Sequence, residues 1–258
     1  MDLSLRDVQN SPHFETAVLT FLNAGGFPPS DSGPTLVPVY LLRAVDSPGP
    51  GSEKEPKNPD YVHFWNVPNI QSLDLAKLMS DNRDNVVYKA IDQFVATEIQ
   101  HFVYYDPFHA FVAPVGPPPA GVRYVWVTHQ FAKTEDYGEY SAYVLLLIIY
   151  LELAGWKNLG IFWNVTGQLN TFSELWSVPE SLAPASSAEI LPRMLDALKA
   201  KYPAPPVNPG TFYFDLVSFY NNLATTTRVL LKSYAYLNGP KASQAATWTT
   251  VPTTARPR

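Results

Sequence analysis

The residues best suited to chemistry in this sequence are a histidine and a glutamate at matching positions of two similar segments. Residues 63–68 read His-Phe-Trp-Asn-Val-Pro and residues 174–179 read Glu-Leu-Trp-Ser-Val-Pro, so Trp, Val and Pro recur 111 positions apart. Each segment has the composition of a β-strand, in which alternate side chains share one face. His63 and Glu174 are therefore expected on the same face of equivalent strands, inside one interior space. An imidazole and a carboxylate in one cavity form a general acid–base set.

The surroundings of such a pair would set its ionisation. Burial raises the pKa of a glutamate, and a neighbouring histidine opposes that rise. The alternative is a satisfied polar pair with a structural role, because structural ion pairs also occupy such places. The residues expected to line the same space and contact a substrate are mostly aromatic: Tyr61, Trp65, His101, Tyr124, Trp126, Phe172 and Trp176. In a barrel with a filled interior, the same rings would be ordinary core.

The other histidines show no metal-binding pattern. His129 alternates with Val125 and Val127 and is expected on the helix-facing side of its strand. His109 is expected in a loop, and His13 in the first turn of a helix. None of them has the spacing of metal ligands. A single histidine could hold haem, but no position is singled out for that role. We therefore expect neither a metal nor a cofactor.

The repeat indicates duplication of a supersecondary unit. A second echo pairs Phe21-Leu22 and Gly26-Phe27 with Tyr150-Leu151 and Gly155-Trp156. Two copies are too few for a solenoid and suit a duplicated domain whose halves close on each other.

The second copy is predicted to follow the order β-α-β-β-α-β, which is typical of ferredoxin-like units. Its strands are expected at 122–131, 159–165, 171–178 and 211–219, and its helices at 136–154 and 188–202. The first copy is expected to hold helices at 11–24 and 73–94 and strands at 35–45, 61–67 and 98–105, opened by a weak strand in 2–8 or by none. One more helix is predicted at 221–237.

The fold class that follows is α+β, with two ferredoxin-like halves in one chain that form a pseudo-dimeric α/β barrel with its helices outside. The expected divisions are a first half at 1–113, a Pro-rich linker at 114–121, a second half at 122–238 and a tail at 239–258.

Residues 167–176 read Gly-Gln-Leu-Asn-Thr-Phe-Ser-Glu-Leu-Trp. They resemble the G-x-L-N-T-x-x-x-L-W strand signature of NIPSNAP-type proteins of the dimeric α/β-barrel superfamily. The resemblance covers about 122–178 and implies the barrel fold. That superfamily also holds monooxygenases, lyases, isomerases, polyketide cyclases and haem proteins. The sequence departs from the signature at Glu174, where many relatives carry His, and at 124–127, where the family has a charged strand.

Composition excludes several classes of protein. The 258 residues carry a net charge of −5 without a basic stripe, which argues against a nucleic-acid partner. There is no cysteine, hence neither a disulfide nor a thiolate nucleophile. The longest apolar stretch, near 144–150, is too short for a membrane span, and the N-terminus lacks a signal-peptide pattern, so a cytoplasmic location is expected.

The leading functional hypothesis is a cofactor-independent enzyme of the isomerase, cyclase or lyase type, acting on a hydrophobic small molecule in an aromatic-lined cavity. One alternative is a non-catalytic, NIPSNAP-like binding or interaction protein. Another is a cofactor-free or haem-dependent oxygenase. The sequence lacks a phosphate loop, a nucleophile elbow and a dinucleotide fingerprint, which argues against kinases, α/β-hydrolases and hydride transfer. A monomer would suffice for a duplicated barrel, and a homodimer is left open.

Overall fold

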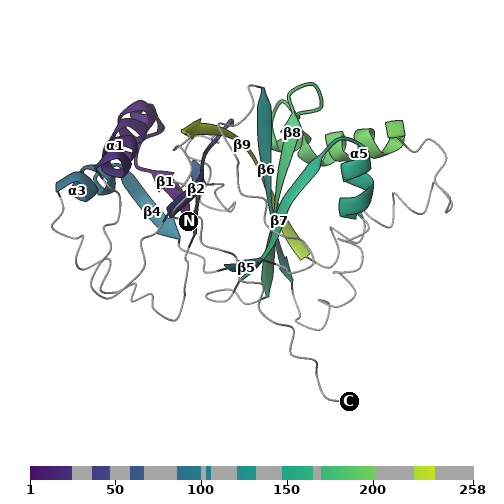
Figure 1. Cartoon of the computed structure of the whole chain (residues 1–258), viewed down its shortest axis with the longest axis horizontal. Coiled ribbons are helices and arrows are strands. Elements are labelled where there is room, and N and C mark those ends of the chain that lie inside the picture. Colours follow the sequence, from purple (N-terminus) through teal and green to yellow (C-terminus); the bar gives the residue numbers. More distant parts are fainter. Residues whose placement is uncertain are drawn as a thin grey trace, which may run out of the picture.

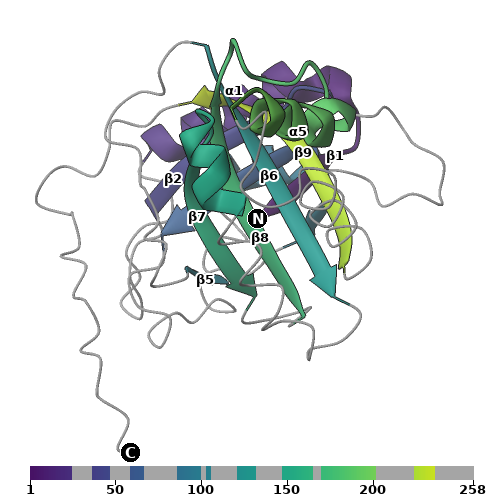
Figure 2. The ribbon, with the colours of Figure 1, turned by 90° about the vertical axis from the view of Figure 1, so that its right-hand side faces the viewer.

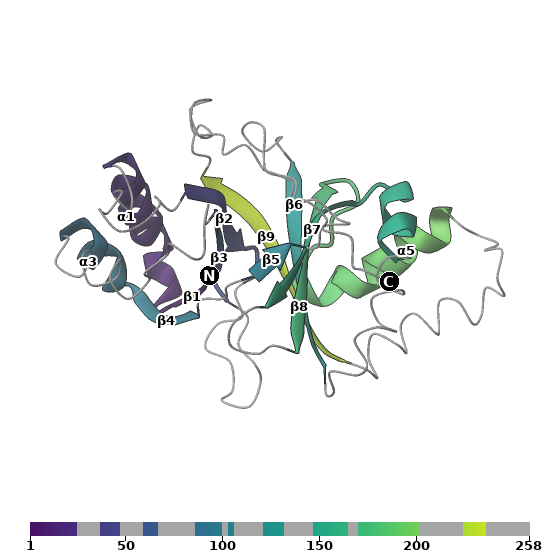
Figure 3. The same cartoon turned by 60° about the horizontal axis from the view of Figure 1, so that its bottom comes forward.

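Two layers of strands lie back to back with helices outside them in the computed structural model (Figure 1). On one side lie α1 (Ser11–Asn23) and α3 (Val86–Asp92), and on the other lie α5 (Ile190–Lys201) and a helix whose described part is 147–153. Figure 3 shows the same order of layers from another direction. The structure describes residues 1–24, 37–46, 59–66, 86–99, 103–105, 121–131, 147–164, 170–201 and 224–235.

The described strands form one antiparallel sheet in the order β4-β1-β3-β2-β9-β6-β8-β7-β5. Two single 3-10 turns, Val8–Asn10 and Ser187–Glu189, precede α1 and α5. The strands are β1 (Asp2–Leu5), β2 (Val37–Ala44), β3 (Tyr61–Asn66), β4 (Val95–Ile99), β5 (Val103–Tyr105), β6 (Val122–Phe131), β7 (Lys157–Asn164), β8 (Thr171–Pro179) and β9 (Ala224–Ala235).

This order contains the same unit twice. The strands β1 to β4 stand in the order β4-β1-β3-β2, and β6 to β9 stand in the equivalent order β9-β6-β8-β7. In both units a helix follows the first strand and another precedes the fourth, which is the ferredoxin-like β-α-β-β-α-β arrangement. The predicted α+β class with ferredoxin-like units is therefore confirmed. We call β1 to β4 with α1 and α3 the first half, and β6 to β9 with the helices 147–153 and α5 the second half.

The sequence explains the ends of the helices that cover the sheet. Ser11 and Pro12 open α1, where a proline loses no helical hydrogen bond, and Phe14, Val18 and Phe21 form its buried stripe. The helix 147–153 ends before Gly155, whose φ of +97° favours glycine, and a Cβ there would lie 3.0 Å from Leu182 Cδ1. Among the described residues, no helix is long and apolar enough to cross a membrane.

The helix predicted at 221–237 is wrong, because Ala224–Ala235 is strand β9. Val229, Leu230 and Leu231 are buried in succession on both faces of β9, so its apolar residues do not alternate with polar ones as in a half-exposed strand. Long-range pairing decides its conformation, since β9 bonds to β6 on one side and to β2 on the other. The run of Thr225, Thr226 and Thr227 was the β-branched signal for a strand.

The single strand predicted at 98–105 is also wrong. The structure has two strands there, and they pair with different partners, β4 with β1 and β5 with β7. The predicted strand at 211–219 and most of the predicted linker lie outside the described residues, as does all but the end of the helix predicted at 73–94.

Aromatic rings fill the layer between the two strand layers. Phe64 of the first half lies 5.0 Å from Trp126 and 5.5 Å from Phe162 of the second, measured between ring centroids. Tyr40 and Tyr124 meet at 5.6 Å. Two further cores lie under the helices, one beneath α1 and one beneath α5 and the helix 147–153. Figure 2 looks onto the second half, where these last two helices lie in front of β6, β7 and β8.

Candidate functional site

On β3 and β8 the strand faces are the reverse of those predicted. Phe64 and Leu175 point away from the face of His63 and Glu174 on their strands, and both belong to the layer between the two strand layers. Tyr61 packs instead in the core beneath α1, and Trp176 in the core beneath α5. Alternation shows which side chains share a face, but both faces of β3 and of β8 pack against apolar residues, so the pattern does not tell which face is the inner one.

The structure therefore separates His63 from Glu174. His63 lies 6.2 Å from the Phe14 ring of α1, and Glu174 hydrogen-bonds to His129 in the second half. The prediction that His63 and Glu174 share one interior space is wrong for this reason. Both do point to the helical side of their own half, as the repeat register requires.

The expected lining residues are divided in the same way. Tyr124 and Trp126 lie in the layer between the strand layers, whereas Phe172 and Trp176 lie on the helical side of the second half. Trp65 is half-buried on β3. His101 and His109 lie outside the described residues, and His13 is exposed.

A first polar cluster, the second-half centre, consists of His129, Glu174, Trp176 and Thr226. His129 Nε2 lies 3.1 Å from Glu174 Oε1, and its Nδ1 lies 3.2 Å from Thr226 Oγ1. Trp176 Nε1 donates to Glu174 Oε2 at 2.8 Å. The His129 ring stacks on Phe172 at 4.5 Å.

This centre is closed to solvent, since neither the His129 nor the Glu174 side chain has any exposed surface. Both ring nitrogens of His129 and both carboxylate oxygens of Glu174 already have a partner. Burial lowers the pKa of His129, and the hydrogen bond to Glu174 opposes that shift. The geometry is that of a satisfied polar pair inside an apolar core.

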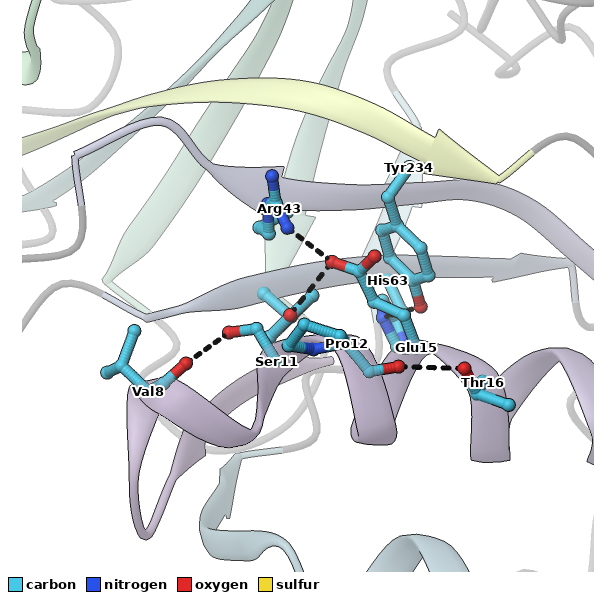
Figure 4. A network of polar contacts seen from close by, with 9 residues as sticks. Val8, Ser11, Pro12, Glu15, Thr16, Arg43, His63 and Tyr234 are labelled. Carbon is cyan, nitrogen blue, oxygen red and sulfur yellow. Dashed lines mark hydrogen bonds and ion pairs between the residues drawn. The ribbon is translucent and has the colours of Figure 1, made fainter.

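A second polar cluster, the first-half centre, consists of Glu15, Arg43, Tyr61, His63 and Tyr234. It lies between α1 and the strands, where Glu15 points toward Arg43 and Tyr234 toward His63 (Figure 4). Glu15 Oε1 accepts hydrogen bonds from Arg43 Nη1 at 2.8 Å and from the Tyr61 hydroxyl at 3.0 Å. Within the described part of the chain, Glu15 Oε2 has no hydrogen-bond partner.

His63 and Tyr234 form the inner end of this centre, with 2.9 Å between Nε2 and the hydroxyl oxygen. Burial lowers the pKa of His63 to about 3, and the positive N-terminal amino group nearby acts in the same direction. Burial likewise raises the pKa of Tyr61 and of Tyr234 above that of an ordinary phenol. These three side chains are therefore neutral near pH 7, whereas Glu15 and Arg43 form an ion pair.

Strand β9 supplies a residue to each centre. Thr226 contacts His129 in the second half, and Tyr234 contacts His63 in the first. Between them on the same face is Lys232, which is paired across the strands with Arg43. Burial lowers the pKa of Lys232, and Arg43 and Arg123 lower it further.

The two halves differ at equivalent positions on the helical side of their strands. Arg43 pairs with Tyr61 in the first half as Trp163 pairs with Phe172 in the second. The neighbour of Arg43 in the next strand is Lys232, and that of Trp163 is Tyr104. Charged groups in one half thus stand where the other half has aromatic residues.

Sequence reasoning missed Glu15, Arg43, Lys232 and Tyr234. The available signal was Arg43, a lone charge in the apolar run Val37–Ala44. The other three come from a helix and from a strand that was predicted as a helix, and no local pattern brings them to Arg43. No group of three potential metal-ligating side chains occurs among the described residues.

Acid is expected to destabilise the fold through His63. Its pKa of about 3 in the folded protein lies below the ordinary value of 6.5, so between these pH values the unfolded chain binds a proton that the folded chain does not. The contribution of neutral His63 is complete above the ordinary pKa and declines as pH falls. At pH 5 the loss is about 2 kcal/mol. Thermal unfolding at pH 7 and pH 5 measures it.

The matched variants for this measurement are His63→Gln and His13→Gln, since His13 is exposed. The difference in stability between pH 7 and pH 5 should shrink in His63→Gln and persist in His13→Gln. Buried His129 adds to the acid sensitivity of both. An equal difference in the two variants would assign the effect to other groups.

Comparison with known proteins supports the fold alone. The chain matches no protein-family model and no curated protein. A solved structure from Fusobacterium nucleatum subsp. nucleatum, provisionally named a monooxygenase, has a TM-score of 0.51 and 9% identity over 91% of this chain and 90% of that chain. Another from Lactobacillus acidophilus NCFM, named in the same way, has a TM-score of 0.48 and 8% identity over 90% of each chain. The chain thus has an α+β fold of the ferredoxin-like class.

Proposed function

We propose that this protein is a small-molecule enzyme whose active site is the first-half centre. The observation that carries the proposal is the Glu15 carboxylate. Its Oε1 is held by Arg43 and Tyr61, its Oε2 has no partner within the described residues, and its side chain is 20% exposed. A proton acceptor of this kind is oriented by the protein and can be reached from solvent, unlike Glu174 in the second-half centre.

The chemistry that fits these groups is the removal of a proton from an electron-rich phenol or enol. Glu15 Oε2 would accept the proton, and Arg43, which remains charged, would stabilise the substrate anion. Tyr61, His63 and Tyr234 would form a neutral, buried wall that excludes water.

We propose cofactor-free oxygenation as the reaction that follows. The substrate anion would react directly with oxygen, and an activated CH₂ group would become a carbonyl. One oxygen atom would enter the product, and the other would leave as water with the two hydrogens of the CH₂ group. The fold similarity to a protein named a monooxygenase supports this choice over an isomerase, cyclase or lyase. An oxygen-independent reaction would share the first step.

Oxygen uptake with a panel of phenols that carry an activated methylene group tests the proposal. Wild-type protein should consume oxygen. When isotopically labelled molecular oxygen is supplied, mass spectrometry should find one labelled oxygen atom in the product. Glu15→Gln should lower kcat/KM by about 10²- to 10⁴-fold, because it removes the proton acceptor and retains the shape.

The matched control is Glu152→Gln, which makes the same change in the second half, where the Glu152 side chain accepts, among the described residues, only from the Asn158 backbone N–H. It should retain activity. Unchanged turnover in Glu15→Gln would contradict the assigned role, and turnover without oxygen would favour an isomerase, cyclase or lyase.

We also propose that the two halves close into one pseudo-dimeric α/β barrel. The strand order supports this, because β4 and β5 stand at its opposite ends although only residues 100–102 separate them in sequence. The division into halves at 1–113 and 122–238 with a linker at 114–121 is part of the same proposal.

A second candidate function is a non-catalytic interaction protein of the NIPSNAP-like kind. The filled layer between the strands favours it, as do Ile149 and Leu153, which are 54% and 59% exposed and one turn apart on the same helix. Analytical ultracentrifugation of wild type and Ile149→Asp tests for self-association through this helix. Association lost in the variant, with no oxygen uptake by wild type, would favour this candidate.

A further inference from the structure

Three cations lie in a row across neighbouring strands where the two halves meet. Arg43 of β2 pairs with Lys232 of β9. On the other side of β9, Tyr124 of β6 pairs with Leu231, which places Arg123 level with Lys232. Because Tyr124 and Leu231 point into the layer between the strands, Arg123 and Lys232 point to the outer side, as Arg43 does.

The two ends of the row are neutralised and its middle is not. Arg43 forms an ion pair with Glu15 and Arg123 with Glu180, each at 2.8 Å. The Lys232 ammonium group has no hydrogen bond or ion pair to any described residue. The pKa of Lys232 is lowered by burial and then by Arg43 and Arg123, which is consistent with a repulsion among like charges that Glu15 offsets only in part. Three cations and two carboxylates leave one net positive charge.

The geometry points to a carboxylate-binding site at Lys232, flanked by Arg43 and Arg123. A monoanion matches the single net charge, whereas a phosphate dianion would bring excess negative charge beside Glu15 and Glu180. The ammonium group would donate to the carboxylate, and the guanidinium groups could add charge-assisted hydrogen bonds. Since both arginine side chains are about 30% exposed, a ligand can reach the row from solvent.

This inference deepens the proposed function and rests on it for the identity of the ligand. Arg43 belongs both to the row and to the first-half centre, so a carboxylate at Lys232 would hold the rest of the molecule near Glu15. The expected substrates are therefore phenols that carry a carboxylate group.

Titration of the full chain with benzoate, benzamide and inorganic phosphate tests the site without turnover. Benzoate should bind more tightly than its neutral isostere benzamide and than phosphate, and added salt should weaken it. Lys232→Met should weaken benzoate binding about tenfold or more, because it removes a charge-assisted contact. The matched control is Lys157→Met, which removes an exposed lysine at the start of β7 and should bind as wild type does.

Equal binding of benzoate and benzamide, stronger binding of phosphate, or an equal loss in both variants would overturn the inference. Kinetics separate it from the proposed function. Benzoate binding that depends on Lys232, without turnover of any substrate, would leave the site in place and refute the enzyme. Turnover that shows no preference for carboxylated phenols over neutral ones, in wild type and Lys232→Met alike, would refute the carboxylate-binding site and leave the proposed enzyme in place.

Discussion

Glu174→Leu is expected to lower the free energy of unfolding by about 3 to 5 kcal/mol. The substitution removes the acceptor for both His129 Nε2 and Trp176 Nε1, which would remain buried without it. Unsatisfied polar groups in an apolar core retain the full cost of their desolvation. Urea denaturation of wild type and variant measures the difference, provided that both unfold in one transition.

The double variant Glu174→Leu/His129→Leu should recover part of the loss, because apolar residues of similar volume can replace a buried pair at little cost. Glu180→Leu is the surface counterpart. It breaks the Arg123 pair, whose Glu180 side chain is 62% exposed, and should cost about 1 kcal/mol or less. A loss of turnover in Glu174→Gln at wild-type stability would instead support the catalytic role predicted from the sequence.

The repeated Trp-x-Val-Pro segments were sufficient to predict equivalent strands. Trp65 lies on β3 and Trp176 on β8, the third strand of each half. The period of a strand also predicted that His63 and Glu174 share a face within their halves. Both inferences depend on local geometry, which the order of residues determines directly.

The sequence did not reveal which face is the inner one. In a sheet with one exposed face, polar residues identify the solvent side. Both faces of β8 are buried, however, and even its polar residues Ser173 and Glu174 are buried. A buried carboxylate is stable only with partners from other strands, and His129 lies 45 positions away. Tertiary contacts of this kind leave no periodic signal.

The first-half centre was harder to predict, because four elements supply it. Glu15 comes from α1, Arg43 from β2, Tyr61 and His63 from β3, and Tyr234 from β9. The last strand belongs to the other half of the chain and was predicted as a helix. Tyr234 reaches His63 only because β9 extends past its own half to pair with β2. A correct strand order would have been needed before the residues could be grouped.

Trp126→Ala is expected to destabilise the protein by about 3 to 5 kcal/mol, since it empties part of the layer between the strands. Trp126 is 7% exposed, and its ring lies 5.0 Å from Phe64 and 5.7 Å from Phe162. These neighbours belong to different halves, so the side chain joins the two. Urea denaturation measures the loss, and Ile149→Ala is the control because an exposed side chain should change stability by about 0.5 kcal/mol or less.

Benzene gives this prediction a second measurement. A cavity lined by apolar rings stays dry and binds small apolar molecules. Saturating benzene should therefore raise the Tm of Trp126→Ala and leave that of wild type unchanged, since ligands that bind only the folded state stabilise it. If benzene raised the Tm of wild type as much as that of the variant, the layer between the strands would already contain a cavity large enough for a ring. The aromatic residues Tyr40, Phe64, Tyr124 and Phe162 would then line a binding space, and the active site would have to be sought there instead of beneath α1.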